Sequence, residues 1–173
     1  QTTRMARALT SRQLHTEALQ LLKDRLPEFE TDFSYLGLLI DIGLRNRSDQ
    51  DQSPETLGEW LEKSLFLAKD SAELEVTLKR SINVFSGTKN RLARIDGLEK
   101  KSAINSRETA FLSALYEKDS RLDDAVTVLQ TGIDSTPDTS EKSLLISRLA
   151  DVHRRGQEFV KAAEVIESLI ELP

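Results

Sequence analysis

Histidine has the widest chemical range of the side chains in this sequence, because imidazole can act as an acid, a base or a metal ligand. The two histidines, His15 and His153, fall in separate expected helices, and neither has a second ligand at helical spacing. The sequence contains no cysteine, no His-Glu-x-x-His motif, no glycine-rich phosphate loop and no Gly-x-Ser-x-Gly motif. We therefore expect a non-enzymatic protein without a metal or cofactor, in which His153 has a packing role.

Neighbouring carboxylates are a second arrangement that can do acid–base chemistry. The pairs Glu28 with Glu30 and Asp123 with Asp124 are expected at the starts of helices. A negative charge there interacts favourably with the positive end of the helix dipole. This structural role accounts for both pairs without catalysis.

Basic residues gather in one segment of an acidic chain. Residues 79–101 hold seven lysines and arginines against Asp96 and Glu99, a balance of +5, which leaves −10 for the rest of a chain whose total is −5. Such a segment can bind an acidic partner or nucleic acid. The cations of this possible anionic-ligand patch are Lys89, Arg91, Arg94, Lys100 and Lys101. The segment 89–103 has no aromatic ring for base stacking, so a solvated helix face is favoured and binding to nucleic acid or an anionic surface is the alternative.

The composition points to a helical protein. The chain has 173 residues, of which 38% are hydrophobic and 31% charged, and only 7 are glycine and 4 proline, which disfavours a turn-rich sheet. No apolar run is long enough to span a membrane. The absence of cysteine suits cytoplasm and periplasm alike, and we favour the cytoplasm. Because the first residue is glutamine, we expect a piece of a longer protein.

Ten helices are expected from apolar residues at helical spacing. They cover residues 2–10, 12–26, 33–46, 54–68, 71–86, 89–103, 106–118, 121–135, 140–155 and 157–172. Paired in order, they give one array of five antiparallel hairpins. The hairpins cover about 1–27, 33–69, 71–103, 106–137 and 140–173.

Local signals mark the ends of several helices and the polar loop at 45–54. Pro27 is expected to end the second helix, Ser53 to cap the fourth and Ser106 to cap the seventh. Two apolar stripes are expected to face the core. They consist of Leu57, Trp60 and Leu61 in one helix and Leu92, Ile95 and Leu98 in another.

A pattern of residue types occurs twice, 37 residues apart. Its first copy is Thr109, Leu112, Ser113, Tyr116, Ala125, Leu129 and Pro137. Its second copy is Ile146, Leu149, Ala150, His153, Ala162, Ile166 and Pro173, with one residue fewer before the proline. The same spacing begins the chain at Thr2, Met5, Ala6, Leu9, Ala18 and Leu22. A period of this length is typical of helical solenoids, in which each unit is one helical hairpin.

The pattern resembles the tetratricopeptide repeat (TPR), in which small residues lie where two helices cross and large residues fill the space between hairpins. The unit at 107–137 matches best and has Gly132 as a further small residue, although Thr109 stands where the family has tryptophan. His153 occupies an aromatic position in the last unit. The two middle units do not carry the motif. The resemblance implies a right-handed α-solenoid.

The resemblance also implies a function, which is to bind a peptide or a partner protein in a concave groove lined by the first helix of each hairpin. The positions that it assigns to partner binding are Arg107, Glu117, Lys118, Asp151 and Arg154. The leading hypothesis is a scaffold that binds another protein or another part of its parent chain. The alternatives are anion binding through 79–101 and a sensor or oligomerisation module of a larger enzyme.

Overall fold

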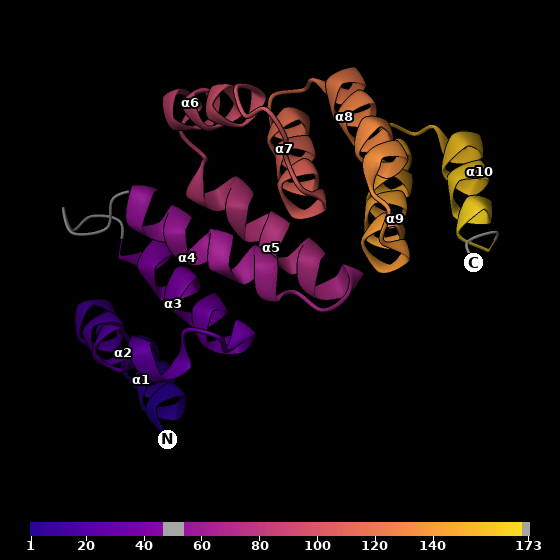
Figure 1. The fold of residues 1–173 in the computed structure, drawn as a ribbon. Coiled ribbons are helices and arrows are strands. Elements are labelled where there is room, and N and C mark those ends of the chain that lie inside the picture. Colours follow the sequence, from indigo (N-terminus) through magenta and orange to yellow (C-terminus); the bar gives the residue numbers. More distant parts are fainter. Residues whose placement is uncertain (47–53, 171–173) are drawn as a thin grey trace.

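The chain folds into an array of helices. The computed structural model describes residues 1–46 and 54–170, and over these residues it contains ten α-helices and no strand (Figure 1). The helices are α1 (Thr2–Ser11), α2 (His15–Phe29), α3 (Phe33–Arg45), α4 (Pro54–Leu67), α5 (Ser71–Val84), α6 (Thr88–Glu99), α7 (Ser106–Lys118), α8 (Leu122–Ser135), α9 (Thr139–Arg155) and α10 (Phe159–Ile170). The all-α prediction is confirmed. The expected cap at Ser53 lies outside the described residues.

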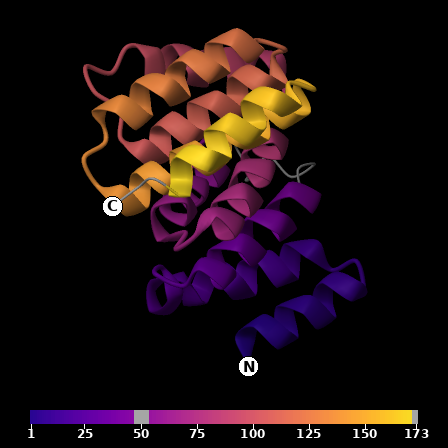
Figure 2. The same ribbon diagram turned by 90° about the vertical axis from the view of Figure 1, so that its right-hand side faces the viewer.

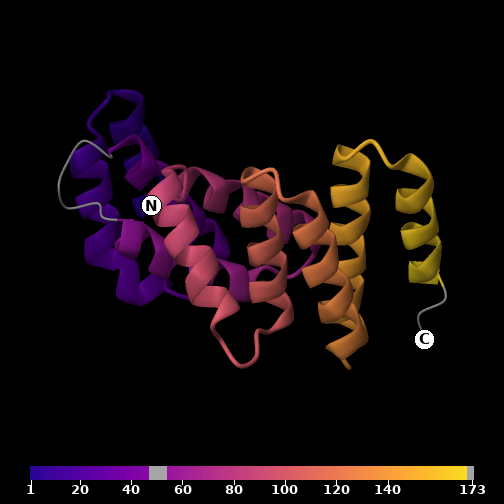
Figure 3. The same cartoon turned by 90° about the horizontal axis from the view of Figure 1, so that it is seen from above.

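Helices that follow each other in sequence pack as antiparallel hairpins in four places, namely α1 with α2, α3 with α4, α7 with α8 and α9 with α10. The second helix of each hairpin also packs on the first helix of the next, and successive first helices contact one another. The prediction of a helical-hairpin array is therefore confirmed. The N-terminal helices and α10 lie at opposite ends of the array (Figure 3).

The pair α5 and α6 departs from this arrangement. Helix α6 packs against α7, and α5 contacts not only α7 but also α9, the first helix of the next hairpin but one. The break between α5 and α6 begins at Phe85, whose N–H donates to the Ser81 carbonyl at 2.9 Å, and Gly87 caps the following helix. The array thus has a direct contact between helices that are not neighbours.

Helix α2 ends later than the sequence predicts. Pro27 lies inside the helix, which continues to Phe29. Proline lacks an N–H donor, but only the last turn is affected, and Phe29 is held by its ring, which stacks on Tyr35 with centroids 4.7 Å apart. The expectation that Glu28 and Glu30 lie at a helix start is consequently wrong, because both lie at the end of α2.

Helix α7 is capped by Asn105, and the prediction of Ser106 as its cap is wrong by one residue. The Asn105 side chain accepts from the Glu108 N–H at 2.9 Å, and the Glu108 carboxylate accepts from the Asn105 N–H at 3.1 Å. This reciprocal pair satisfies two backbone donors that the helix itself leaves free. Ser106 instead uses its hydroxyl to donate to Glu141.

The buried face of α6 is also rotated from the expected stripe. Ile95 and Leu98 are buried as predicted, but Leu92 is 47% exposed and Arg91 is buried in its place. Arg91 can occupy the core position because its apolar stem packs while Asp119 and two backbone carbonyls accept from the guanidinium. The prediction that Leu92 faces the core is wrong.

The repeat residues form the close crossing between α7 and α8. A Cβ atom at Gly132 would lie 2.6 Å from Cγ2 of Thr109, so the two backbones can approach only because residue 132 is glycine. Trp60 is buried in the core, as expected. His153 is buried as well, and its Nδ1 lies 2.7 Å from the Glu158 carboxylate, which confirms its packing role.

Candidate protein-interaction surface

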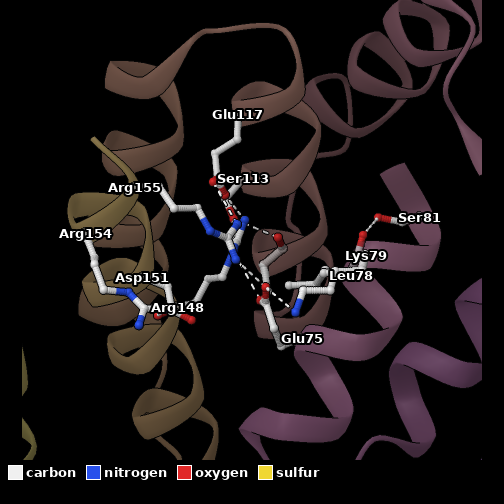
Figure 4. Close-up of polar contacts among 11 residues, drawn as sticks. Glu75, Leu78, Lys79, Ser81, Ser113, Glu117, Arg148, Asp151, Arg154 and Arg155 are labelled. Atoms are coloured by element: carbon white, nitrogen blue, oxygen red, sulfur yellow. Dashed lines mark hydrogen bonds and ion pairs between the residues drawn. The ribbon is translucent and has the colours of Figure 1, made fainter. Parts of the chain in front are cut away.

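An ion-pair network joins α5, α7 and α9 (Figure 4). Arg148 of α9 is 2% exposed, and its guanidinium donates to Glu117 of α7 and, at 3.3 Å, to Glu75 of α5. Its Nε donates to the Ser113 hydroxyl at 3.2 Å. Arg155 lies two turns later on α9 and donates to Glu117 at 3.0 Å and also to Glu75. We call Glu75, Glu117, Arg148 and Arg155 the inner network.

The inner network is balanced in charge, with two guanidinium groups facing two carboxylates. Burial lowers the pKa of Arg148 to about 10, because a low-dielectric site disfavours the charged form, and the negative charge of Glu75 opposes this effect. Arg148 therefore remains a cation at neutral pH. The network fixes α5, α7 and α9 relative to one another.

Two of the predicted partner-binding residues make contacts within the chain. Glu117 belongs to the inner network, and only 10% of its side chain is exposed. Arg107 donates to the Glu141 carboxylate at 2.8 Å and to the Ala68 carbonyl at 2.7 Å. It therefore ties the start of α7 to the start of α9 and to the end of α4.

The other three predicted residues are more accessible. Lys118 is exposed at the end of α7. Asp151 accepts a hydrogen bond from Arg154 at 2.7 Å, both residues belong to α9, and the arginine is largely exposed. The five residues do not form one cluster, since Arg107 and Lys118 lie at opposite ends of α7.

The basic residues of the possible anionic-ligand patch are mostly paired within the chain. Arg91 pairs with Asp119 at 2.6 Å and Lys100 with Asp96 at 2.7 Å. The other two pairs are Arg94 with Glu62 and Lys101 with Glu108. Among the described residues, Lys89 is the member of this set without an ion pair, and it is exposed. The structure thus brings carboxylates to four of the five cations.

The end of the array carries an uncovered apolar surface that the repeat makes easy to recognise. Leu129 of α8 is 0% exposed, whereas Ile166, its counterpart 37 residues later in α10, is 51% exposed. Four positions become more exposed in α10 than in α8. They are Ala163, Ile166, Leu169 and Ile170, whose counterparts are Val126, Leu129, Gly132 and Ile133. We call the first four residues the α10 stripe.

The difference arises because α9 covers α8 and no described helix covers α10 in the same way. Leu145 of α9 lies 3.2 Å from a Cβ placed at Gly132, and Leu149 of α9 lines the same small cavity as Ile133. Helix α10 is outermost in Figure 2, which looks onto this end of the molecule. The sequence pattern identified Ile166 as a core position. The signal that could have revealed its exposure is its place in the chain. Leu129 is followed by another hairpin that covers it, whereas Ile166 lies in the last described helix.

A groove of about 460 Å³ lies beside the α10 stripe. Its walls come from α5, α9 and α10, and include Ala72, Ser147, Ala150, Asp151, Ile166 and Leu169. In the preceding unit, the counterparts of Ser147 and Ala150 are Ala110 and Ser113, which are fully buried where α9 packs on α7. The groove and the α10 stripe together therefore repeat the surface that receives α9. We call this combined surface the end socket.

Other kinds of site are not evident in the described part of the chain. No group of three potential metal ligands comes together among residues 1–46 and 54–170. Within the same ranges, no helix combines the length and apolar character needed to span a membrane.

Comparison with known proteins gives similarities to solved structures of helical repeats. No protein-family model and no curated protein matches the sequence. A putative kinesin light chain with TPR-like repeats from Podosopora anserina is 14% identical with a TM-score of 0.47, over 98% of this chain and 92% of the other. A MamA protein is 15% identical with a TM-score of 0.45, over 98% and 91%. MamA from Desulfovibrio magneticus RS-1 is 19% identical with a TM-score of 0.37, over 99% and 95%.

Proposed function

We propose that this protein is an interaction scaffold that binds an amphipathic helix of a partner protein in the end socket. The observation that carries the proposal is the exposure of the α10 stripe at positions that are covered one repeat earlier. Burying a large apolar side chain stabilises a contact by about 1.5–3 kcal/mol, so Ile166 and Ile170 provide a driving force for association. An apolar helix face in a groove is a common mode of peptide recognition.

The charged residues around the end socket support specificity for such a helix. Asp151 lines the groove and Arg154 is exposed beside it, which agrees with the partner-binding roles proposed for both residues. Glu117 and Arg107 support the surface indirectly by holding α7, α9 and α4 together. Anion binding through 79–101 has less support, because four of its five cations have carboxylate partners.

The test uses a peptide that should fit the end socket. A labelled peptide of residues 138–156 contains α9, the helix that occupies the equivalent surface of α7 and α8. We expect the peptide to bind the intact protein in fluorescence anisotropy, and Ile166→Glu to weaken binding at least tenfold, because a carboxylate would be buried without a partner.

Val160→Glu is the matched control for this experiment. Val160 is another exposed apolar residue of α10, at 73% against 51% for Ile166, but its repeat counterpart Asp123 is exposed although α9 packs on α8. Binding to Val160→Glu should equal binding to the unmodified protein. Equal affinity for all three proteins, or no binding to any of them, would show that the end socket does not receive a helix.

A further inference from the structure

The opposite end of the array exposes a complementary surface on α1. Its counterpart is α9, because the repeat places residue 5 of the chain in the position of residue 149. Leu149 is 4% exposed where it packs beneath α8, whereas Met5 is 58% exposed. Three positions that are buried in α9 are exposed in α1, namely Arg4, Met5 and Ala8. We call these residues the α1 stripe.

Among the described residues, α1 and α10 therefore each lack one neighbouring helix. Helix α10 is the second helix of its hairpin, and no described helix of a following hairpin packs on its stripe. Helix α1 is the first helix of its hairpin, and no described helix of a preceding hairpin packs on it. Within the array, the contact between α8 and α9 joins these two kinds of helix. A contact between α10 of one copy and α1 of another would repeat that step.

The two ends also differ in charge. Residues 1–16 contain Arg4, Arg7 and Arg12 and no carboxylate, and all three arginines are exposed without an ion pair among the described residues. At the other end, Asp151 lines the end socket and accepts from the exposed Arg154, and Glu167 is exposed on α10. A basic helix would thus be attracted by Glu167 and Asp151 in competition with Arg154.

We propose that copies of this chain associate head to tail, with the α1 stripe of one copy docked in the end socket of the next. Met5 would pack against Ile166 and Ile170, in the way that Leu149 packs near Ile133 inside the array. A Cβ atom at Gly156 would lie 3.8 Å from Leu122, and the repeat counterparts of these residues are Arg12 and Phe159. The docked copy would accordingly bring a cation beside an exposed aromatic ring.

This proposal rests on the proposed function, because it names the helix that the end socket receives. The contact is heterologous, since it joins two different surfaces. Unless the rotation between copies closes a ring, each added copy presents a new end socket, so the assembly grows with concentration. A contact between two α10 stripes would stop at a dimer.

Sedimentation velocity over a concentration series tests the proposal with four single variants. The weight-average mass of the intact chain should rise with concentration, whereas Met5→Glu and Ile166→Glu should each remain at 19.5 kDa. Gln13→Glu and Val160→Glu are matched controls, because the repeat counterparts of these positions, Gln157 and Asp123, are exposed. Both controls should assemble like the intact chain.

Mixing the two interface variants gives the decisive measurement. Met5→Glu keeps an intact end socket and Ile166→Glu keeps an intact α1 stripe, so an equal mixture should form a dimer of twice the monomer mass and grow no further. An intact chain that stays monomeric throughout, or a Met5→Glu variant that still dimerises alone, would overturn the proposal. Binding of the 138–156 peptide in those cases would leave the proposed function standing, and its absence would remove both.

Discussion

Folding changes the pH at which Tyr116 ionises. Its hydroxyl donates to the Glu99 carboxylate at 2.6 Å, and the Arg121 guanidinium lies 4.3 Å from the ring centroid. Burial, followed by the hydrogen bond to Glu99, raises the pKa of Tyr116 to about 12. The folded state therefore holds this proton more tightly than the unfolded chain, in which tyrosine has a pKa of about 10.

The resulting prediction concerns stability at alkaline pH. Because the pKa is raised on folding, the stabilisation from neutral Tyr116 is complete below pH of about 10 and is lost as the pH rises through about 12. Denaturant midpoints measured across this range should fall less steeply for Tyr116→Phe than for the intact chain. In a titration followed by phenolate absorbance, Glu99→Gln should ionise Tyr116 at lower pH. Titration of Tyr116 near pH 10 in the folded chain would contradict the assignment.

For single residues, the sequence predicted which apolar side chains are buried better than which charged side chains are buried. Trp60 and His153 lie in the core as expected, because their positions follow the helical pattern. Arg91 and Arg148 were not expected to be buried, since arginine is seldom buried without partners. Their partners, Asp119 for Arg91 and Glu75 for Arg148, come from other helices, so the pattern within one helix carries no signal for them.

The close crossing of α7 and α8 predicts the effect of a larger side chain at position 132. Gly132→Ala should destabilise the protein by about 1–3 kcal/mol, because the new methyl group would lie 2.6 Å from Thr109 and overpack the crossing. Gly97→Ala is the control, since nothing lies within 4 Å of a Cβ there, and it should stabilise α6 by up to about 1 kcal/mol. Urea denaturation measures both changes.

Thr109→Ser provides a rescue that separates crowding from other effects. It removes the methyl carbon nearest to the added Cβ, so Gly132→Ala should cost less in the Thr109→Ser background than in the intact chain. Equal costs in the two backgrounds would mean that the close approach of α7 and α8 does not limit residue 132.

The sequence predicted the existence of the helices more completely than their ends and partners. Apolar periodicity and the 37-residue repeat suffice for the helices, because both are local properties of the chain. The departure of α6 from α5 and the exposure of the α10 stripe depend on which helices are neighbours in space. The residues alone favoured a buried Ile166, and only its place in the last described helix explains why it is exposed.

For the whole molecule, the contact between α5 and α9 changes how the array should unfold. In an array where each unit contacts only its neighbours, stability is a sum of unit and interface terms, and the ends can open separately. Arg148 and Arg155 connect α9 directly to Glu75 of α5, so opening of the last hairpin also breaks contacts with α5. The inner network should therefore couple α5, α7 and α9 into one cooperative unit.

Hydrogen exchange followed by mass spectrometry tests this coupling. In the intact chain, the slowest amides of α5, α7 and α9 should share one opening free energy. Arg148→Met should speed exchange in α9 far more than in α3, because Glu75 and Glu117 lose a buried partner while the N-terminal hairpins keep their contacts. Lys63→Met is the control, since its exposed pair with Glu30 contributes little, and it should leave the exchange of α9 unchanged. If Arg148→Met instead accelerates exchange equally in α3 and α9, the array unfolds as a whole and the network is not what joins its C-terminal hairpins to α5.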